Sequence, residues 1–210
     1  MAGDCVKMEI KGRVVVIVGA SGGIGSAISK HLAGLGAKVV LAGRNGERLR
    51  QLARELPGSL PVPADITKSE ENQALVSKVM GEFGRIDVLI NCAGQAMFAS
   101  VESIDLDQYH DLLELNVVAP MRLMQLVIPH MRDQGKGVIV NVSSMASTRN
   151  IPNIAGYASS KCALNSLSLT AREELAKDGI VVSVIRPGIV DTDFGKHTNS
   201  PEPEALRRFP

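Results

Sequence analysis

The sequence predicts an α/β fold in which helices cover both faces of one doubly wound parallel sheet, giving three layers, α/β/α, in a single domain. Short runs of β-branched apolar residues alternate with helical patterns along the chain, an arrangement typical of strand–helix–strand units. A glycine-rich turn joins the first such run to the first helical pattern. The length of 210 residues suits one domain with a sizeable core.

The composition argues against several classes of function. Lys and Arg total 23 against 22 Asp and Glu, a net charge of +1, so nothing attracts the chain to nucleic acid or an anionic membrane. Aromatic residues make up only 3%, with no tryptophan, which disfavours stacking on single-stranded nucleic acid. Charges interrupt any signal-peptide pattern near the N-terminus, and no apolar run approaches a membrane span. We therefore expect a cytoplasmic protein that binds neither nucleic acid nor membrane.

The cysteines Cys5, Cys92 and Cys162 are odd in number and widely separated. Their spacing matches no metal-binding pattern, so we expect no metal site. Small buried residues in a reducing compartment are the better interpretation.

The first predicted strand, Val14–Val18, is apolar throughout, as in a strand buried on both faces. It leads into a glycine turn over residues 19–25 and then into a helical pattern. A pyrophosphate binds in this context, because backbone N–H groups at a helix N-terminus point at the anion. Gly19 would allow the tight turn, and Gly23 and Gly25 would let the backbone approach a dinucleotide.

Residues 37–42 are predicted to form the second strand, with Arg44 just beyond its end. An acidic residue here would bind the ribose 2′-hydroxyl of NAD, but none is present. The guanidinium instead suits the 2′-phosphate of NADP, and Ser21 could add a hydroxyl donor. The sequence therefore favours NADP(H); the alternative is an arginine that contacts only solvent.

The alternation continues with a helix to about residue 56 and strands at residues 60–64, 86–90, 138–142 and 180–185. Thr67 and Glu70 have the spacing of a capping box, which predicts a helix from there to about residue 83. A long helix over residues 107–131 contains Pro120. Proline has no N–H, so the helix should kink and free the carbonyl of Asn116 to hold a water. A kink that serves only packing is the alternative.

The last long helix, from Tyr157 to about residue 177, carries Tyr157 and Lys161 on one face, four residues apart. Acid–base work near neutrality requires a tyrosine pKa about three units below its usual ~10, or about 4 kcal/mol. A cation about 4 Å away at an effective dielectric of ~20 supplies about that much. Burial alone would raise the pKa, so the lysine must outweigh it. A surface helix that carries both residues by chance is the alternative.

Four motifs together resemble the short-chain dehydrogenase/reductase family. The wide Gly-x3-Gly-x-Gly turn is one, and Ser144, thirteen positions before Tyr157, stands at the family's catalytic serine in preference to Ser143. The other two are Asn91-Cys92-Ala93-Gly94, in which Cys92 replaces the family's second asparagine, and Pro187-Gly188-x3-Thr192.

The resemblance implies a Rossmann-type fold and hydride transfer between NADP(H) and a carbonyl or secondary alcohol. It suggests 3-oxoacyl thioesters as one class of substrate. It implies four catalytic residues: Asn116, Ser144, Tyr157 and Lys161. With the reasoning above, the residues expected at the cofactor are Gly19, Ser21, Gly23, Ile24, Gly25, Arg44, Asp65, Ile66, Asn91, Ala93, Gly94, Tyr157, Lys161, Pro187, Gly188 and Thr192. Asp65 would contact adenine, or cap a helix, or both, and Asn91 would first of all hold its strand.

In the implied mechanism Tyr157 exchanges a proton with the substrate oxygen, which Ser144 holds. Lys161 lowers the tyrosine's pKa and binds the nicotinamide ribose, and Asn116 supports a water that resupplies the proton. The loop over residues 145–155 would form a substrate wall, with Arg149 either gripping an anionic group or contacting solvent. The family also implies a homodimer or homotetramer. A non-catalytic NADP-binding regulatory protein of the same fold is the competing class.

The chain departs from the family pattern in two places. NADP-dependent members often carry a second basic residue just before the middle glycine, where this chain has Gly22, so NADP preference depends mainly on Arg44. Members also close with a further helix and a seventh strand, which this sequence lacks. We therefore expect residues 180–185 to form an uncovered edge, or else the sequence stops short of the biological C-terminus.

Overall fold

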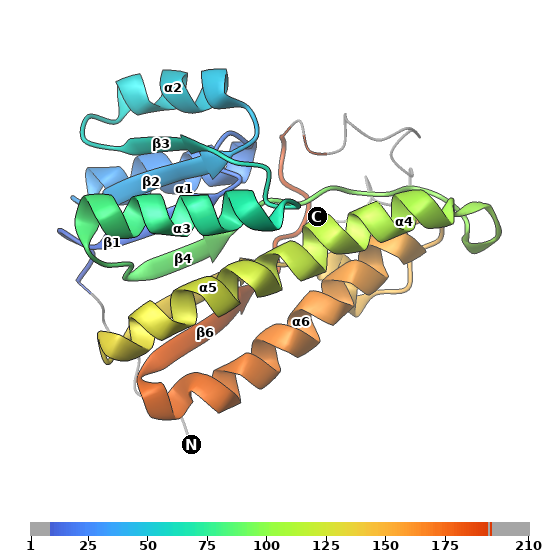
Figure 1. Cartoon of the computed structure of the whole chain (residues 1–210). Coiled ribbons are helices and arrows are strands. Elements are labelled where there is room, and N and C mark those ends of the chain that lie inside the picture. The colour runs from blue at the N-terminus through green and yellow to red at the C-terminus, as the bar shows by residue number, and fades with distance from the viewer. Residues whose placement is uncertain (1–8, 193, 195–210) are drawn as a thin grey trace.

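The structure, a computed structural model, describes residues 9–192 and 194. They form a six-stranded parallel sheet with the strand order β3-β2-β1-β4-β5-β6 and helices on both faces (Figure 1). Helices α3, α5 and α6 cover one face, while α1 and α2 pack against the other. This is the doubly wound, three-layer α/β fold that the sequence predicted.

Every predicted strand is present, with small shifts at the ends. The strands are β1 (Val14–Val18), β2 (Lys38–Gly43), β3 (Leu60–Pro63), β4 (Val88–Asn91), β5 (Gly137–Val142) and β6 (Ile180–Ile185). The α-helices are α1 (Gly23–Gly34), α2 (Gly46–Glu55), α3 (Ser69–Phe83), α4 (Leu106–Leu113), α5 (Ala119–Asp133) and α6 (Ala155–Leu175). Four short turns are η1 (Val101–Ser103), η2 (Glu114–Val118), η3 (Met145–Thr148) and η4 (Ala176–Asp178), of which η2 is π-helical.

The central strand β1 explains why the sequence is so apolar there. It pairs with β2 on one side and β4 on the other, and all of its residues are buried. Val14, Val16 and Val18 join the core under α3 and α5, whereas Val15 and Ile17 join the core under α1 and α2. From β1 the chain moves outward to β2 and β3 and then crosses back, so that β4 lies on the other side of β1. This reversal opens a crevice at the carboxyl ends of β1 and β4.

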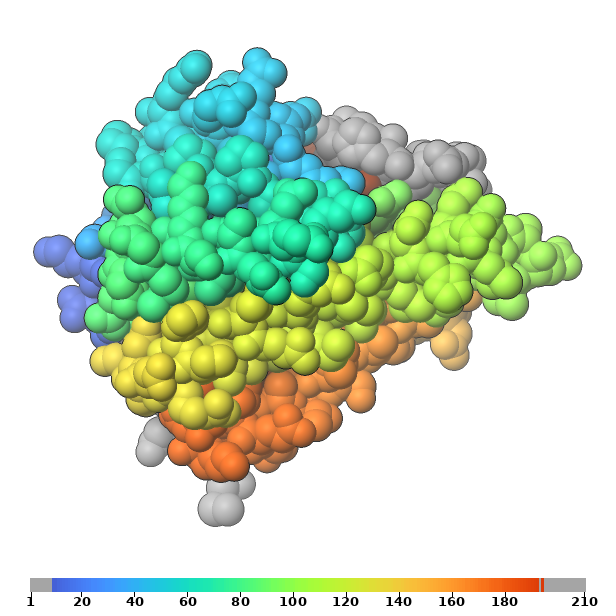
Figure 2. All heavy atoms as spheres, in the orientation of Figure 1, coloured from blue at the N-terminus to red at the C-terminus, as the bar shows by residue number. Residues whose placement is uncertain are grey.

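The helices α3, α5 and α6 lie side by side, and their side chains cover one face of the sheet (Figure 2). The continuous helical run from 106 to 133 is long and apolar enough to cross a membrane, which corrects the expectation that no such run exists. Half of its most apolar window is buried inside the protein, and Leu115, Leu123 and Val127 lie in the core. Core helices pass the same test of length and composition, so the run carries no further conclusion.

A π-helical turn stands where the sequence predicted a simple proline kink. The N–H of Ala119 donates to the carbonyl of Glu114, five residues back, and Pro120 follows in the first turn of α5. Turns of this kind frequently occur at functional sites. This one contains Asn116, which is fully buried.

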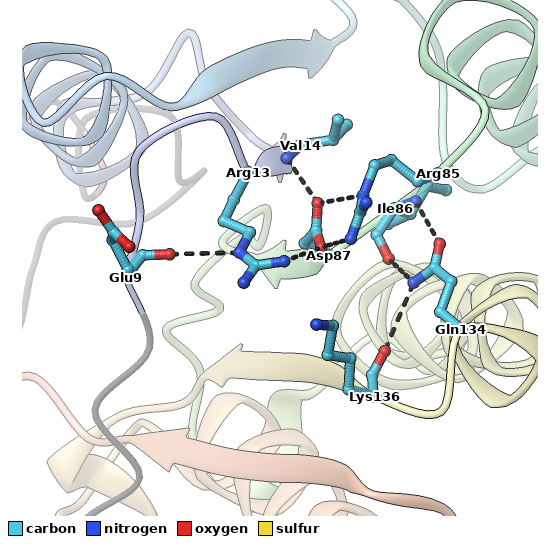
Figure 3. A network of polar contacts seen from close by, with 8 residues as sticks. All are labelled: Glu9, Arg13, Val14, Arg85, Ile86, Asp87, Gln134 and Lys136. Carbon is cyan, nitrogen blue, oxygen red and sulfur yellow. Dashed lines mark hydrogen bonds and ion pairs between the residues drawn. The ribbon is translucent and has the colours of Figure 1, made fainter.

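Asp87 holds together the amino-terminal edge of the sheet (Figure 3). Its carboxylate is only 3% exposed and accepts bonds from the Arg85 guanidinium at 2.6 and 2.9 Å, from Arg13 at 3.2 Å and from the Val14 N–H at 2.9 Å. Burial raises the pKa of Asp87, but the hydrogen bonds and charges of these partners outweigh it and leave the pKa lowered. The cluster therefore fixes the start of β1 against the start of β4.

Three smaller expectations need correction or comment. The capping box does not form, because the Thr67 hydroxyl donates to Asp65 at 2.8 Å and α3 begins only at Ser69. Cys162 is exposed, so the prediction of a buried cysteine is wrong there. Cys92 is half-buried, and Cys5 lies outside the described residues.

Strand β6 stands at the edge of the sheet and pairs with β5. Its residues Val181 and Ile185 are 42% and 49% exposed. Within the described chain, β6 is therefore the uncovered edge that the sequence predicted.

Candidate active site

The glycine turn begins where β1 ends. Gly19 has a φ of +87°, and a Cβ there would lie 2.6 Å from the backbone nitrogen of Ala93. A Cβ on Gly25 would collide with the carbonyl of Gly19. Gly25 thus allows α1 to pack on the turn itself, and its expected place at a pyrophosphate stays a prediction.

The N-terminus of α1 is suited to bind an anion. Its N-cap is Gly22, which provides no side-chain cap, and the first turn contains no acidic residue. Backbone N–H groups at a helix N-terminus lack intrahelical partners and carry partial positive charge. The N–H groups of Gly23, Ile24 and Gly25 belong to this first turn, so the donor set fits a phosphate.

Arg44, Ser21 and Asp65 meet at the carboxyl ends of β2 and β3. A Cβ on Gly43 would lie 3.3 Å from the Ser21 Oγ, and the exposed Arg44 follows directly. Burial raises the pKa of Asp65, yet hydrogen bonds from Thr67 and the charge of Arg44 leave it lowered. The basic and hydroxyl groups expected at a 2′-phosphate therefore lie together, with a carboxylate near them.

Two residues expected at the cofactor also make structural contacts. Ile66 packs in the core under α3. Asn91 is 3% exposed and donates to Asn141 at 2.8 Å, and Asn141 in turn donates to Ser168 at 2.8 Å. This buried polar chain ties β4, β5 and α6 together, which agrees with holding the strand as the first role of Asn91.

Tyr157 and Lys161 lie in the first turns of α6, 9% and 3% exposed. The ammonium of Lys161 lies over the Tyr157 ring, 5.9 Å from its centre, and donates to the carbonyl of Val142 at 3.1 Å. The Ser144 side chain hydrogen-bonds that of Tyr157, whereas Ser143 donates to the backbone carbonyl of Lys161 at 3.3 Å. The structure thus brings Ser144, rather than Ser143, to the phenol.

Burial decides the protonation of this pair. Tyr157 belongs to an apolar cluster with Phe98 and Ile154, and burial raises its pKa, while the hydrogen bond with Ser144 lowers it by less. Burial also lowers the pKa of Lys161 to about 8. The prediction that the lysine outweighs burial is therefore wrong for this structure, because the lysine is itself desolvated.

Cys92 replaces the second asparagine of the family motif. Burial raises the pKa of its thiol to about 11, although the charge of Lys161 acts in the opposite direction. The thiol therefore stays neutral beside the ammonium at physiological pH.

Asn116 joins the π-helical turn to α6 and to the loop after β4. Its side chain donates to the Gln95 carbonyl at 2.9 Å and to the Ser160 hydroxyl at 3.0 Å, and it accepts from the Gln95 N–H at 3.0 Å. A Cβ on Gly94 would lie 3.1 Å from the Asn116 Oδ1 and 3.3 Å from the Lys161 Nζ. Glycine at this position leaves the space beside the ammonium open.

Sequence reasoning missed Ser160, although it stands between Tyr157 and Lys161. It is fully buried, and its hydroxyl donates to the Tyr157 carbonyl at 2.7 Å while accepting from Asn116. Its place three residues after Tyr157 puts it on the inner face of α6, which is the signal that could have found it.

The segment after β6 returns across the crevice. The carbonyl of Pro187 accepts from the Met145 N–H at 2.9 Å, and Gly188 has open space around it. Thr192 lies against Gly23, since a Cβ there would come within 2.8 Å of the Thr192 Cβ. The ring of Phe194 stacks at a tilt on Tyr157, with 6.0 Å between ring centres. Sequence reasoning missed Phe194.

A separate hollow of about 380 Å³ lies between the loop over residues 95–99 and α4, lined in part by Asp105, Gln108 and Asp111. None of the four expected catalytic residues lines it. Among the described residues, no group of three His, Cys, Asp or Glu side chains could hold a metal ion.

Comparison with known proteins places the chain in a family. A family model described as short chain dehydrogenase matches residues 13–203. An uncharacterized oxidoreductase of Staphylococcus epidermidis is 32% identical over 200 residues, covering 94% of this chain and 86% of that protein.

Two solved structures show the same fold. The 3-ketoacyl-(acyl-carrier-protein) reductase from Brucella melitensis, complexed with NADH, has a TM-score of 0.86 and 30% identity, covering 88% of this chain and 78% of that one. A metagenomic short-chain oxidoreductase in complex with NADP has a TM-score of 0.82 and 35% identity, covering 87% and 85%. With the glycine turn and the buried Tyr157–Lys161 pair, these matches show that the chain is an oxidoreductase of the short-chain dehydrogenase family.

Proposed function

We propose that the protein is an NADP(H)-dependent oxidoreductase that interconverts a carbonyl and a secondary alcohol. The observation that carries the proposal is the arrangement of Ser144, Tyr157 and Lys161 at the same sheet edge as the uncapped N-terminus of α1. One similar structure is a complex with NADP and another with NADH, so the choice of NADP depends on Arg44.

The residues present fit such a cofactor. The first-turn N–H groups of α1 would hold the pyrophosphate, and Arg44 with Ser21 would hold the 2′-phosphate. Lys161 and the space kept open by Gly94 would receive the nicotinamide ribose. The bound nicotinamide supplies or accepts the hydride, and the side chains of this chain handle the proton.

The raised pKa of Tyr157 suits the direction of reduction. A phenol that stays protonated at neutral pH can donate its proton to the carbonyl oxygen as negative charge develops there. The Ser144 hydroxyl holds the same oxygen. Lys161, with a pKa of about 8, is mostly protonated near neutrality, and its charge stabilises the phenolate that remains.

Asn116 positions these groups. All three of its hydrogen bonds go to Gln95 and Ser160, so its side chain sets the distance between α6 and the loop after β4. We propose that the backbone carbonyl of Asn116 supports the water that resupplies the proton.

The surroundings of Tyr157 favour a substrate with an apolar part next to the carbonyl. Its neighbours Ala96, Phe98, Ala146 and Ile154 are apolar. Because one similar structure is a 3-ketoacyl-(acyl-carrier-protein) reductase, 3-oxoacyl thioesters belong in the substrate panel. Arg149, in the neighbouring loop, is exposed.

The test is NADPH oxidation across a panel of ketones and 3-oxoacyl thioesters. Tyr157→Phe should lose about 10²–10⁴-fold in kcat, the usual contribution of a general acid, while binding NADPH as well as wild type. Tyr109→Phe is the matched control, because it removes the other tyrosine hydroxyl of the chain, which bonds Ser159 at 2.8 Å; its turnover should be unchanged. Equal turnover by Tyr157→Phe and wild type would contradict the mechanism, whereas tight binding without turnover on any carbonyl would support a regulatory protein.

The cytoplasmic location and the homodimer or homotetramer remain parts of the proposal. Light scattering of the purified protein tests the assembly. A monomer at micromolar concentration would contradict both the homodimer and the homotetramer.

A further inference from the structure

Two polar residues outside the four expected catalytic residues connect helix α6 to the turn that carries Ser144. Asn165 is buried in α6, and its side-chain N–H donates to the Ser147 hydroxyl at 2.8 Å. The Ser147 hydroxyl in turn donates to the backbone carbonyl of Ser144 at 2.6 Å. A further contact joins the same elements, because the Cys162 thiol donates to the Ser147 carbonyl at 3.2 Å. These hydrogen bonds therefore run from α6 through η3 to the backbone of Ser144.

The direction of each bond follows from the protons available. Ser147 has one hydroxyl proton, and its contact with the Ser144 carbonyl requires that proton, because a carbonyl can only accept. The Ser147 oxygen therefore accepts from Asn165, which identifies the amide nitrogen of Asn165 as the atom that faces it. The side-chain oxygen of Asn165 is buried and has no hydrogen-bond partner among the described residues.

This unpaired oxygen argues against a role for Asn165 in packing alone. A buried amide that lacks one partner is less favourable than an apolar side chain of similar shape, such as leucine. Asn165 is only 9% exposed, and the hydrogen bond that its side chain makes within the described chain goes to Ser147. What the amide provides is thus a fixed position for the Ser147 hydroxyl.

Ser147 fixes the peptide group that follows Ser144. Its N–H donates to the same Ser144 carbonyl at 3.1 Å, beside its hydroxyl. The Ser144 hydroxyl accepts from the Ala146 N–H at 3.1 Å, so its own proton is left for Tyr157 or for a substrate oxygen. Since Tyr157 and Asn165 both belong to α6, one helix positions the phenol and, through Ser147, the serine beside it.

We propose that Ser147 and Asn165 are positioning residues, which hold the Ser144 hydroxyl in the place relative to Tyr157 that proton transfer to a carbonyl requires. This rests on the proposed function, since Ser144 and Tyr157 must act on a carbonyl. Both residues act through Ser144 rather than on the reacting atoms. A misplacement of about 1 Å can cost about 10²-fold in rate, so the loss of either hydrogen bond has a measurable effect.

The first test is kcat for NADPH-dependent reduction of the carbonyl that wild type reduces fastest. Ser147→Ala and Asn165→Leu should each lower kcat by about 10-fold to 10²-fold, with KM for NADPH unchanged. Ser147→Thr keeps the hydroxyl and should restore most of the turnover. Ser166→Ala, the same change at an exposed residue of α6, is the matched control and should turn over as wild type does.

The second test shows whether the two residues act through Ser144. In a Ser144→Ala background the hydroxyl that they position is absent, so Ser147→Ala and Asn165→Leu should lower kcat no further. A general structural role would lower kcat by the same factor in both backgrounds. The affinity for NADP⁺, measured by calorimetry, establishes that each variant is folded and binds the cofactor.

The outcomes separate the positioning role from the proposed function. Wild-type kcat in Ser147→Ala and Asn165→Leu would overturn the positioning role, and so would equal losses with and without the Ser144 hydroxyl. The proposed function stands in both cases. If wild type and Ser166→Ala bind NADP⁺ but reduce no carbonyl, the proposed function fails, and the positioning role fails with it.

Discussion

The ammonium of Lys161 lies over the ring of Tyr157, 5.9 Å from its centre, and donates its hydrogen bond to the Val142 carbonyl. Both groups are buried, and burial opposes the charged form of each: the pKa of the tyrosine is raised and that of the lysine is lowered to about 8. The buried charge of Lys161 therefore lowers the free energy of unfolding at neutral pH.

Replacing Lys161 with methionine should stabilise the protein and abolish turnover. The folded pKa of about 8 lies below the ordinary 10.5, so the unfolded chain binds more protons between these values and wild-type stability rises with pH across that window. Below about pH 8 the full cost remains, roughly 3–4 kcal/mol for a pKa lowered from 10.5 to about 8 at ~1.4 kcal/mol per unit. The unpaired Val142 carbonyl offsets about 1 kcal/mol of the gain.

Urea unfolding of wild type and Lys161→Met at about pH 7 and about pH 9.5 checks this expectation. The variant should be more stable at the lower pH, and the difference should shrink at the higher one. A variant that is less stable than wild type at both values would show that burial does not dominate at this site.

Ser144→Ala should shift the pH dependence of alcohol oxidation upward. Oxidation requires the phenolate of Tyr157, and the hydrogen bond with Ser144 lowers the pKa of that phenol. Without this bond the pKa rises further, so the rising limb of log kcat against pH moves to higher pH. The limb reports the coupled Tyr157–Lys161 pair rather than one residue, and an unchanged limb with a lower plateau would restrict Ser144 to holding the substrate.

Arg44→Asp should transfer preference from NADP to NAD. The change removes the cation beside Ser21 and places a carboxylate where a 2′-phosphate would be repelled. We expect the ratio of kcat/KM for NADPH over NADH to fall at least about tenfold, which corresponds to ~1.4 kcal/mol. Arg54→Asp, in the last turn of α2, makes the same charge change and should leave the ratio as in wild type.

Asp87→Asn should destabilise the fold without changing the chemistry. The variant loses the charge that Arg13 and Arg85 both contact, and leaves these guanidinium groups less well paired, at a cost of about 2–4 kcal/mol. Because the folded pKa of Asp87 is lowered, its contribution is present above the ordinary value of 3.8 and is lost as pH falls through the folded pKa.

Thermal unfolding between about pH 3 and about pH 7 measures this contribution. Wild type should lose stability on acidification more steeply than Asp87→Asn, and kcat at 25 °C should be equal in the two proteins. A large drop in kcat for a folded Asp87→Asn would mean that the two edges of the sheet are coupled.

The local patterns of the sequence are sufficient to predict the strands of the sheet. The apolar run of Val14–Val18 and the turn that follows each have one good structural solution, because a residue buried on both faces must be apolar and a positive φ at Gly19 requires glycine. The interval between Ser144 and Tyr157 likewise selected the serine that reaches the phenol.

Other features depend on contacts between distant segments, which no local pattern carries. The close approach of Gly25 to the Gly19 carbonyl is one of them. The balance of burial and charge at Tyr157 depends on Phe98 and Ile154, which come from other elements. The contacts of Thr192 and Phe194 arise from an irregular segment, where no periodicity indicates which face a side chain takes.

The Asp87 cluster and the reacting groups lie at opposite ends of the strands. The five residues of β1 separate the two ends by about 16 Å, roughly twice the Debye length of about 8 Å at physiological ionic strength. Substitutions in the loops around Tyr157 can therefore change the substrate while the Asp87 cluster continues to hold the start of β1 against the start of β4. Substitutions at the Asp87 cluster should therefore change heat tolerance without changing which substrates the protein accepts.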